Sequence, residues 1–400
     1  MSDTFTARLG AAKASAARVP SRTFVNIAEV PVAAWRNLFS RAIEPNAFYH
    51  PDWARAASEN SREASGAKVL LAWDKHDRTR LIGLMPVVSG WQALGLPLPL
   101  LVAWQPYTRL TTPLLDAECA EEAAAALIEA ACEAGARALL HIDYAPNGAA
   151  SQALNTTLAA RDLIPRVFRV RDRAILDATQ EPDAMLYDAL GAKKLKELRR
   201  QHNRLEDSGD VKFDVATSPA DVATALDQFL ALEASGWKGT RGTAMAADNG
   251  DVAFLRTATA ALAADGLCEI VTLTAGGAPV AAGIVLRHGP RAYFFKIAYD
   301  EALAKSSPGV QLTLDLTRHL CADPTITTVD STANAYHPMI DKIWRNRLAI
   351  ATALIPLRAN DPFIGAIQFL IHARERTRRD VRRYFHLLQD KLHAFREKLR

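Results

Sequence analysis

The hydrophobic pattern between residues 267 and 320 predicts three strands followed by a turn and a helix. Apolar residues alternate along Leu267–Ala275, and two further apolar runs follow, each after a glycine-containing turn: Pro279–His288 and the aromatic run Arg291–Tyr299. Ser307-Pro308-Gly309 then precedes a segment with apolar residues at helical spacing, Val310–Cys321. Unpaired N–H groups at such a turn and at a helix N-terminus can bind a pyrophosphate. An isolated Ser-Pro-Gly is also an ordinary helix start, so this interpretation depends on the strands before it.

The first half of the chain shows a similar pattern. It predicts a hairpin formed by Lys68–Trp73 and Arg80–Ser89 and a third strand, Leu98–Trp104. Two helix–strand pairs follow: helix Glu121–Gly135 with strand Ala138–Tyr144, and helix Ser151–Arg161 with strand Leu163–Val170. After Val310–Cys321, the second half continues with strand Ile326–Asp330, helix His337–Asn346 and strand Leu348–Leu357. Asp143 and Asp330 each end a strand and are 187 residues apart (330 − 143). This predicts a duplicated α/β unit, with a coincidental alternation of elements as the alternative.

Two further helices are expected where the halves meet. Gly191–Gly209 is basic and amphipathic, and Pro219–Ser235 follows it. We therefore predict a disordered leader over residues 1–22, an N-terminal domain over 23–172, a C-terminal domain over 173–358 and a helical tail over 359–400.

Composition narrows the possible classes of protein. The chain has 400 residues, 49% of them hydrophobic, which is enough for two ordinary cores. The sequence contains no run of eighteen uncharged apolar residues, so no membrane-spanning helix is expected. The four cysteines show no metal-binding spacing and favour a reducing compartment.

Charge is concentrated in the tail. His372–Arg400 holds ten Lys or Arg against four Asp or Glu, which gives this segment a formal charge of +6. Because the whole chain has a formal net charge of +4, the rest of the chain sums to −2. The body is therefore not expected to bind DNA. Leu387, Leu388, Leu392 and Phe395 have helical spacing in the tail. The tail is either a helix on an anionic membrane surface or a helix packed on the body with a solvated basic face.

Several short motifs occur in an order that resembles one family. They are Asn46–Trp53, Pro113–Asp116, the basic helix ending at Arg204-Leu205, Phe229–Glu233, Gly236-Trp237, Gly277–Ala282, Tyr299-Asp300, Ser307-Pro308-Gly309, Asp330 and Asp341–Trp344. Over residues 24 to 357 the chain resembles the FemAB-like, GNAT-related acyltransferases, and within them the acetyltransferases of cellulose and exopolysaccharide biosynthesis.

The resemblance implies an α/β (α+β) fold with two tandem GNAT-like domains, whose mixed, mostly antiparallel sheets are flanked by helices, and a basic C-terminal helix. It implies a cytoplasmic enzyme, or one peripheral at the inner membrane, that moves an acetyl or other acyl group from acyl-CoA to an amino sugar or polysaccharide precursor. A polysaccharide synthase is an expected partner of the tail. The oligomeric state is left open.

Two alternatives remain at this point. The chain has one glycine where typical GNAT enzymes have a longer glycine-containing loop, and relatives in the Fem group use aminoacyl-tRNA, so a Fem-type aminoacyl transferase is the second hypothesis. The third is a non-catalytic assembly factor for envelope polysaccharide synthesis.

Acyl transfer needs donor binding, a positioned acceptor and proton transfer. The predicted donor-binding residues are Ser307, Gly309, Val310 and Gln311. Asp330 and Glu233 are predicted bases, with Asp300 and His337 as further candidates, and Tyr299 would protonate the leaving thiolate. A bulge in Arg291–Tyr299 would expose a backbone N–H to the thioester carbonyl.

The predicted substrate-binding residues are Lys193, Arg200, Trp237, Lys342 and Trp344. Lysine and arginine would neutralise phosphates, and the tryptophans would stack on a sugar or nucleotide. Each also has a simpler interpretation as a solvated charge or a packing residue. The histidines have no ligand spacing, so no metal is expected.

Overall fold

The computed structural model describes residues 23–62, 66–104, 107, 110–207 and 209–398, with side chains described as far as residue 381. The expected leader and the apolar positions expected along the end of the tail therefore lie outside what is described.

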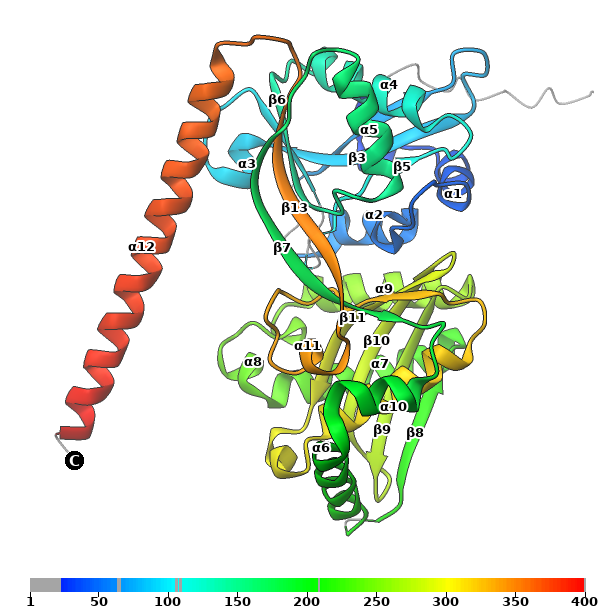
Figure 1. Cartoon of the computed structure of the whole chain (residues 1–400), viewed down its shortest axis with the longest axis vertical. Coiled ribbons are helices and arrows are strands. Elements are labelled where there is room, and N and C mark those ends of the chain that lie inside the picture. Colours follow the sequence, from blue (N-terminus) through cyan, green and yellow to red (C-terminus); the bar gives the residue numbers. More distant parts are fainter. Residues whose placement is uncertain (1–22, 63–65, 105–106, 108–109, 208, 399–400) are drawn as a thin grey trace, which may run out of the picture.

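One mixed sheet of thirteen strands runs through both halves of the chain (Figure 1). The first half supplies β1 (Phe24–Asn26), β2 (Lys68–Trp73), β3 (Leu81–Ser89), β4 (Leu100–Ala103), β5 (Leu114–Leu115), β6 (Ala138–Tyr144) and β7 (Arg166–Asp177). The second half supplies β8 (Val211–Ala216), β9 (Cys268–Ala275), β10 (Ala278–His288), β11 (Arg291–Tyr299), β12 (Thr328–Asp330) and β13 (Asn346–Pro356). The strands lie in the order β1-β2-β3-β4-β6-β13-β7-β12-β11-β10-β9-β8, and β5 pairs with β3.

Helices cover both faces of this sheet. One face carries α1 (Val32–Ser40), α2 (Pro51–Asn60), α7 (Pro219–Ser235) and α9 (Asn249–Ala264). The other carries α4 (Ala120–Glu133), α5 (Ala149–Ala159), α6 (Pro182–Glu206), α10 (Pro308–Ala322) and α11 (Ile340–Ile343). The remaining helices are α3 (Gly90–Leu94), α8 (Trp237–Thr240), α12 (Phe363–Lys398) and the 3-10 turns η1 (Ile27–Glu29), η2 (Ala47–Tyr49), η3 (Met245–Ala247) and η4 (Glu301–Ser306). The predicted α/β class, with a mostly antiparallel mixed sheet, is confirmed.

Most predicted elements are present, and three differ in extent. The predicted helix Gly191–Gly209 is the second part of α6, because Gly191 has φ 73° and breaks the helical path there. The strand predicted to end at Val170 continues to Asp177. The helix predicted over His337–Asn346 is wrong in length: α11 is one turn, and Trp344 then enters the core ahead of β13.

The two halves have matching arrangements. In each half, the strand before a helix pairs in parallel with the strand after it: β4 with β6, and β11 with β12. Asp143 ends β6 and pairs with Arg171 at 2.7 Å, whereas Asp330 ends β12 and pairs with Arg173 at 3.1 Å. Both arginines lie on β7. The duplication predicted from the 187-residue spacing therefore appears as two aspartates tied to one shared strand.

Strands β7 and β13 join the halves. β13 pairs with β7 over most of its length and with β6 at its far end, so the last strand of the second half lies beside a strand of the first. The boundary predicted between residues 172 and 173 falls inside β7. The predicted domain limits stay predictions.

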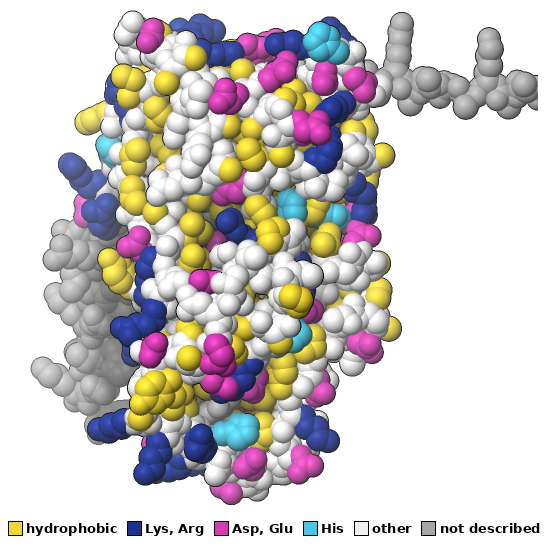
Figure 2. Space-filling view, turned by 45° about the vertical axis from the view of Figure 1, so that its right-hand side comes forward, with side chains coloured by type: hydrophobic (Ala, Val, Ile, Leu, Met, Phe, Trp, Pro, Cys, Tyr) yellow, Lys and Arg dark blue, Asp and Glu magenta, His cyan; other side chains and the backbone are white. Residues whose placement is uncertain are grey.

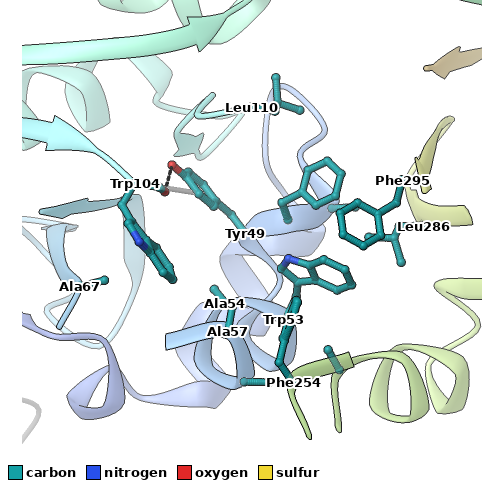
Figure 3. Close-up of a cluster of buried hydrophobic side chains, with 14 of the residues drawn as sticks. Tyr49, Trp53, Ala54, Ala57, Ala67, Trp104, Leu110, Phe254, Leu286 and Phe295 are labelled. Carbon is teal, nitrogen blue, oxygen red and sulfur yellow. Dashed lines mark hydrogen bonds between the residues drawn. The ribbon is translucent and has the colours of Figure 1, made fainter. Parts of the chain in front are cut away.

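A buried aromatic cluster fills the space between the halves (Figure 3). The ring of Trp53 on α2 meets the rings of Phe254 and Phe295 edge-on, with centroids 4.9 and 5.0 Å apart. The hydroxyl of Tyr49 donates to the carbonyl of Trp104 at 2.9 Å. Because these side chains come from both halves, the halves share one core.

No helix in the described part of the chain has the length and apolar character needed to cross a bilayer.

We expect stability to fall as the pH drops from about 6.5 to about 4. Burial lowers the pKa of His288 to about 4, although two backbone hydrogen bonds act in the opposite direction. Its ring accepts from the Asn46 N–H at Nδ1 (2.8 Å) and contacts the Phe39 carbonyl through Nε2 (2.8 Å). The unfolded chain binds a proton at this histidine below about 6.5 and the folded chain does not. Urea unfolding at several pH values should show this loss, and it should be smaller for His288→Gln. An identical pH dependence of the two proteins would contradict it.

Candidate functional site

The predicted irregularity in the aromatic strand is present. Ile284 of β10 pairs with Lys296 of β11, and Val285 pairs with Phe294, so Phe295 is an extra residue in β11. On its other side β11 pairs with β12 only over Arg291–Tyr293. β12 ends at Asp330, opposite Tyr293, so the rest of β11 has no strand beside it on this side in the described residues. The Thr332 hydroxyl donates to the Phe294 carbonyl at 2.8 Å. The end of β11 therefore offers backbone groups to a ligand.

The turn after β11 leads to the N-terminus of α10. Ser307 has left-handed backbone angles (φ 51°, ψ 52°), and its carbonyl accepts from the N–H groups of Val310 (2.9 Å) and Gln311 (3.1 Å). Pro308 has no N–H. In the described part of the chain nothing accepts a hydrogen bond from the Gly309 N–H. Among the predicted donor-binding residues, Gly309 therefore has a backbone N–H that is available to donate to a phosphate.

Gly309 is required for packing as well. A Cβ atom at this position would lie 2.9 Å from Cδ1 of Tyr299. The Tyr299 ring therefore lies directly against the glycine. Two residues predicted separately, one as donor-binding and one as proton donor, thus form one contact at the end of β11.

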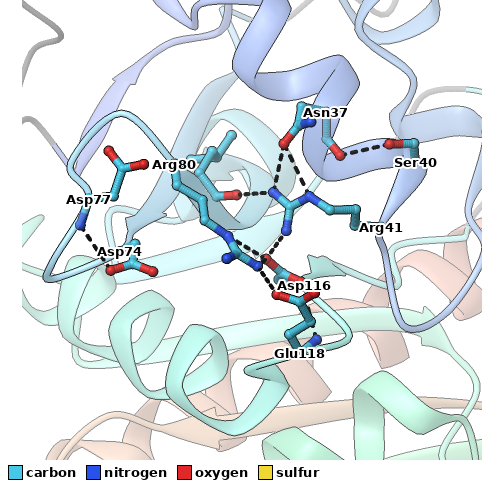
Figure 4. Close-up of polar contacts among 9 residues, drawn as sticks. Asn37, Ser40, Arg41, Asp74, Asp77, Arg80, Asp116 and Glu118 are labelled. Carbon is cyan, nitrogen blue, oxygen red and sulfur yellow. Dashed lines mark hydrogen bonds and ion pairs between the residues drawn. The ribbon is translucent and has the colours of Figure 1, made fainter.

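The corresponding turn in the first half has the opposite electrostatic character. α4 begins after Cys119 and has Glu121 and Glu122 in its first turn, whereas the first turn of α10 has no acidic residue. Just before α4, Arg41 and Arg80 pair with the buried Asp116, as Figure 4 shows. Carboxylates at a helix N-terminus repel a diphosphate. The first half is therefore a poor donor site.

A small hollow lies beside Tyr299, with a volume of about 30 Å³, which is room for about one water molecule. Its lining includes Glu233, Trp237, Lys238, Tyr299 and Glu301. Three residues that the sequence proposed for different roles, Glu233, Trp237 and Tyr299, are thus brought together. Trp237 is 48% exposed, and its backbone N–H donates to the carboxylate of Glu301 at 2.9 Å.

Glu233 is an ionised, buried carboxylate rather than a surface residue. Its Oε1 lies 2.8 Å from Nζ of Lys238 and 3.7 Å from Nζ of Lys296, and its Oε2 accepts from the Met245 N–H at 2.8 Å. Burial raises its pKa, but the two lysines outweigh burial, so the pKa lies below its ordinary value. The carboxylate is therefore charged at neutral pH.

Lys296 and the charged group behind it were not predicted from the sequence. Burial lowers the pKa of Lys296, although Glu233 acts in the opposite direction. Its Nζ lies 5.9 Å from the centre of the Tyr107 ring, and Tyr107 and Arg62 both donate to the buried Asp251. A lysine inside the aromatic strand was a usable signal. Arg62 and Asp251 were not detectable, since 189 residues separate them.

The basic residues predicted to bind substrate lie apart from this hollow. Lys193 and Arg200 are exposed on α6, and Arg200 pairs with Glu197 at 2.9 Å. Figure 2 shows Lys and Arg side chains at the lower end of the molecule, where Figure 1 places α6. Lys342 is exposed on α11, which packs against α6. α6 is also tied to the turn, because Arg204 donates to the Lys305 carbonyl at 2.9 Å.

Two predicted roles are wrong in this structure. Trp344 is fully buried and its indole N–H donates to Thr317 at 2.9 Å, so it packs in the core and cannot stack on a substrate. Asp330 is 1% exposed, pairs with Arg173 and accepts from the Thr332 N–H at 2.7 Å. Asp330 therefore caps its turn and orders the sheet, and it cannot reach an acceptor.

The side chain of Gln311 has a structural role too. Its Nε2 donates to the Leu198 carbonyl of α6 at 2.8 Å. This bond fixes α6 beside the start of α10.

One group of side chains in the described residues has the spacing of metal ligands: His50, Asp52 and Asp265. The guanidinium of Arg36 pairs with both carboxylates, and His50 Nδ1 accepts from the Asp52 N–H. These ligand atoms are engaged by protein groups, so the geometry is explained without a metal.

Comparison with known proteins adds a family and a fold. Residues 192–337 match the model of the Acetyltransferase (GNAT) domain family. This matched segment contains β11, the turn after it and α10. No curated protein matches the chain in sequence.

Solved structures resemble the chain at low sequence identity. One is the C-terminal domain of a protein named as a lysylphosphatidylglycerol synthetase from Agrobacterium fabrum, with 12% identity, 85% of this chain and 94% of that chain covered, and a TM-score of 0.54. Another is FemX, with 11% identity, 84% and 98% covered, and a TM-score of 0.54. A third is a conserved protein of unknown function from Bacteroides thetaiotaomicron, with 13% identity, 82% and 98% covered, and a TM-score of 0.52. These similarities extend over both halves and support the predicted tandem fold.

Proposed function

We propose that the chain, whose residues 192–337 match the GNAT domain, takes an acyl group, most simply acetyl, from acyl-CoA and transfers it to an amine or hydroxyl of a saccharide precursor. The observation that supports this most strongly is the bulged β11, unpaired beyond Tyr293 on its β12 side, followed by the unbonded Gly309 amide, within the segment that matches the GNAT domain. A diphosphate at the N-terminus of α10 would place the rest of CoA along this unpaired edge.

The acceptor would lie at the mouth of the hollow beside Tyr299, because the hollow itself has room for about one water molecule. Trp237 offers an exposed ring for a sugar face, and the buried, charged carboxylate of Glu233 would receive a proton through a water in the hollow. Attack by an amine on the thioester carbonyl forms a C–N bond and a cationic nitrogen. The proton on that nitrogen is acidic, so even a carboxylate of low pKa can accept it. The C–S bond then breaks, and the Tyr299 hydroxyl protonates the thiolate.

A Fem-type aminoacyl transferase is the second candidate. The exposed basic face of α6 beside the donor turn favours it, because a tRNA donor needs more cationic surface than a single amide supplies. Filter binding with charged tRNA separates the candidates. Retention that weakens in Lys193→Glu/Arg200→Glu supports the tRNA donor, and absence of retention supports acyl-CoA. The acceptor-saccharide assignment, with a cellulose or exopolysaccharide precursor as its first case, is tested by CoA release with amino sugars and sugar nucleotides.

Tyr299→Phe should lower kcat by about 100-fold with unchanged affinity for the donor. The phenyl ring keeps the contact with Gly309, and the variant loses the proton donor only. Release of CoA thiol at saturating acceptor measures this. Tyr187→Phe, at an exposed tyrosine of α6, is the matched control and should keep the full rate. A Tyr299→Phe variant as fast as this control would remove Tyr299 from the mechanism.

A further inference from the structure

Helix α12 begins on the body of the protein and then leaves it. Ile364, Ile367 and Ile371 are buried in the shared core, and the ring of His372 lies 4.7 Å from that of Phe168. Arg374 makes the last of these contacts, donating to the Leu94 carbonyl of the α3 segment. From Glu375 to Val381 every residue is exposed, and Figure 1 shows the helix running alongside the molecule.

The exposed surface of α12 carries an apolar stripe with arginines on both flanks. Phe363, Leu370 and Val381 are seven and eleven residues apart, which is close to two and three helical turns, so they share one side. They are 53%, 39% and 62% exposed. Arg378 lies eight residues after Leu370, about 80° around the helix, and Arg376 lies six residues after it, about 120° around in the other direction. Arg137 lies over the ring of Phe363, 4.2 Å from its centre, whereas Leu370 and Val381 remain exposed.

A second exposed apolar element lies beside α12. Trp91 of α3 is 64% exposed, and the segment that follows it, residues 93–100, is almost entirely apolar (ALGLPLPL). The bond from Arg374 to Leu94 holds this segment against the helix. Tryptophan has an apolar ring and a polar N–H, which suits the boundary between lipid and water.

We propose that α12 and the α3 segment dock the protein on an anionic lipid bilayer. The helix would lie in the plane of the surface, with Leu370 and Val381 among the acyl chains and the flanking Arg376 and Arg378 against the phosphates. Exposed aromatic and aliphatic side chains account for insertion, and the arginines supply the charge complementarity that a neutral bilayer or an apolar protein groove lacks.

Flotation of the full chain with lipid vesicles tests this. We expect the protein to float with phosphatidylcholine vesicles that contain phosphatidylglycerol, to stay behind with phosphatidylcholine alone, and to dissociate as salt rises. Arg376→Gln/Arg378→Gln should weaken binding by about 30-fold, at about one basic residue's attraction each. Trp91→Ala should weaken it through the second element. Lys193→Gln/Arg200→Gln removes the same charge from exposed positions on α6 and should bind as the unmodified protein does.

Three results would overturn the proposal. They are absence of flotation with anionic vesicles, equal binding to both vesicle types, and equal weakening by the α6 control. Sedimentation without lipid tests the other possible partner, a second copy of the chain. A dimer broken by Arg376→Gln/Arg378→Gln would assign this surface to that second copy.

Discussion

Replacing Asp251 by alanine should lower the free energy of unfolding by about 3 kcal/mol. The carboxylate is fully buried and accepts from the Arg62 N–H at 2.9 Å, from the Arg62 guanidinium and from the Tyr107 hydroxyl. Arg62 and Tyr107 belong to the first half, and Asp251 begins α9 in the second. Removing the carboxylate leaves a cation and two donors without their acceptor at the junction of the halves.

Urea unfolding measures this loss as a lower midpoint. Asp227→Ala is the matched control, because Asp227 is exposed and its pair with Arg256 at 2.5 Å is solvated. That change should cost less than about 1 kcal/mol. Equal midpoints for the two variants would show that the junction depends on the apolar cluster around Trp53 alone.

Gly309→Glu should weaken donor binding by about 1000-fold. A carboxylate about 4 Å from a phosphate charge costs about 4 kcal/mol at an effective dielectric constant of 20. The new side chain also collides with Tyr299, since a Cβ atom has 2.9 Å to the ring. Gly309→Ala separates the two effects, because it adds the collision without the charge. The dependence of CoA release on donor concentration measures both.

A closely matched control is present in the same half. Ser218-Pro219-Ala220 begins α7 as Ser307-Pro308-Gly309 begins α10, and Ala220 is exposed. Ala220→Glu therefore adds the same charge at the same helix position, far from any proposed phosphate. If it weakened the donor as much as Gly309→Glu does, the turn after β11 would not be the donor site.

Local pattern was sufficient for the elements and for part of the site. Apolar runs bounded by glycine-containing turns located β9, β10 and β11 within one residue of their observed bounds, because each strand has apolar residues on both faces of a buried sheet. The Ser-Pro-Gly turn and the strand irregularity were predictable for the same reason: both are set by a few neighbouring residues.

Contacts between distant segments were not predictable. Asp330 looked like a base at a strand end, but Arg173 of β7 neutralises it, and that partner is 157 residues away. Trp344 looked like a stacking residue because its burial depends on α10. Glu233 was expected to be solvated or catalytic, and only the fold brings Lys238, Lys296 and Met245 around it. Charge neutralisation across the fold, which one sequence does not encode locally, decided these roles.

Calorimetric titration of the folded chain with acetyl-CoA tests the central claim most directly, namely that the Gly309 turn of the second half holds a diphosphate donor. The predicted result is saturable heat with one site per chain, absent in Gly309→Glu and retained in Ala220→Glu. No heat at millimolar acetyl-CoA, or the same heat in all three proteins, would contradict it.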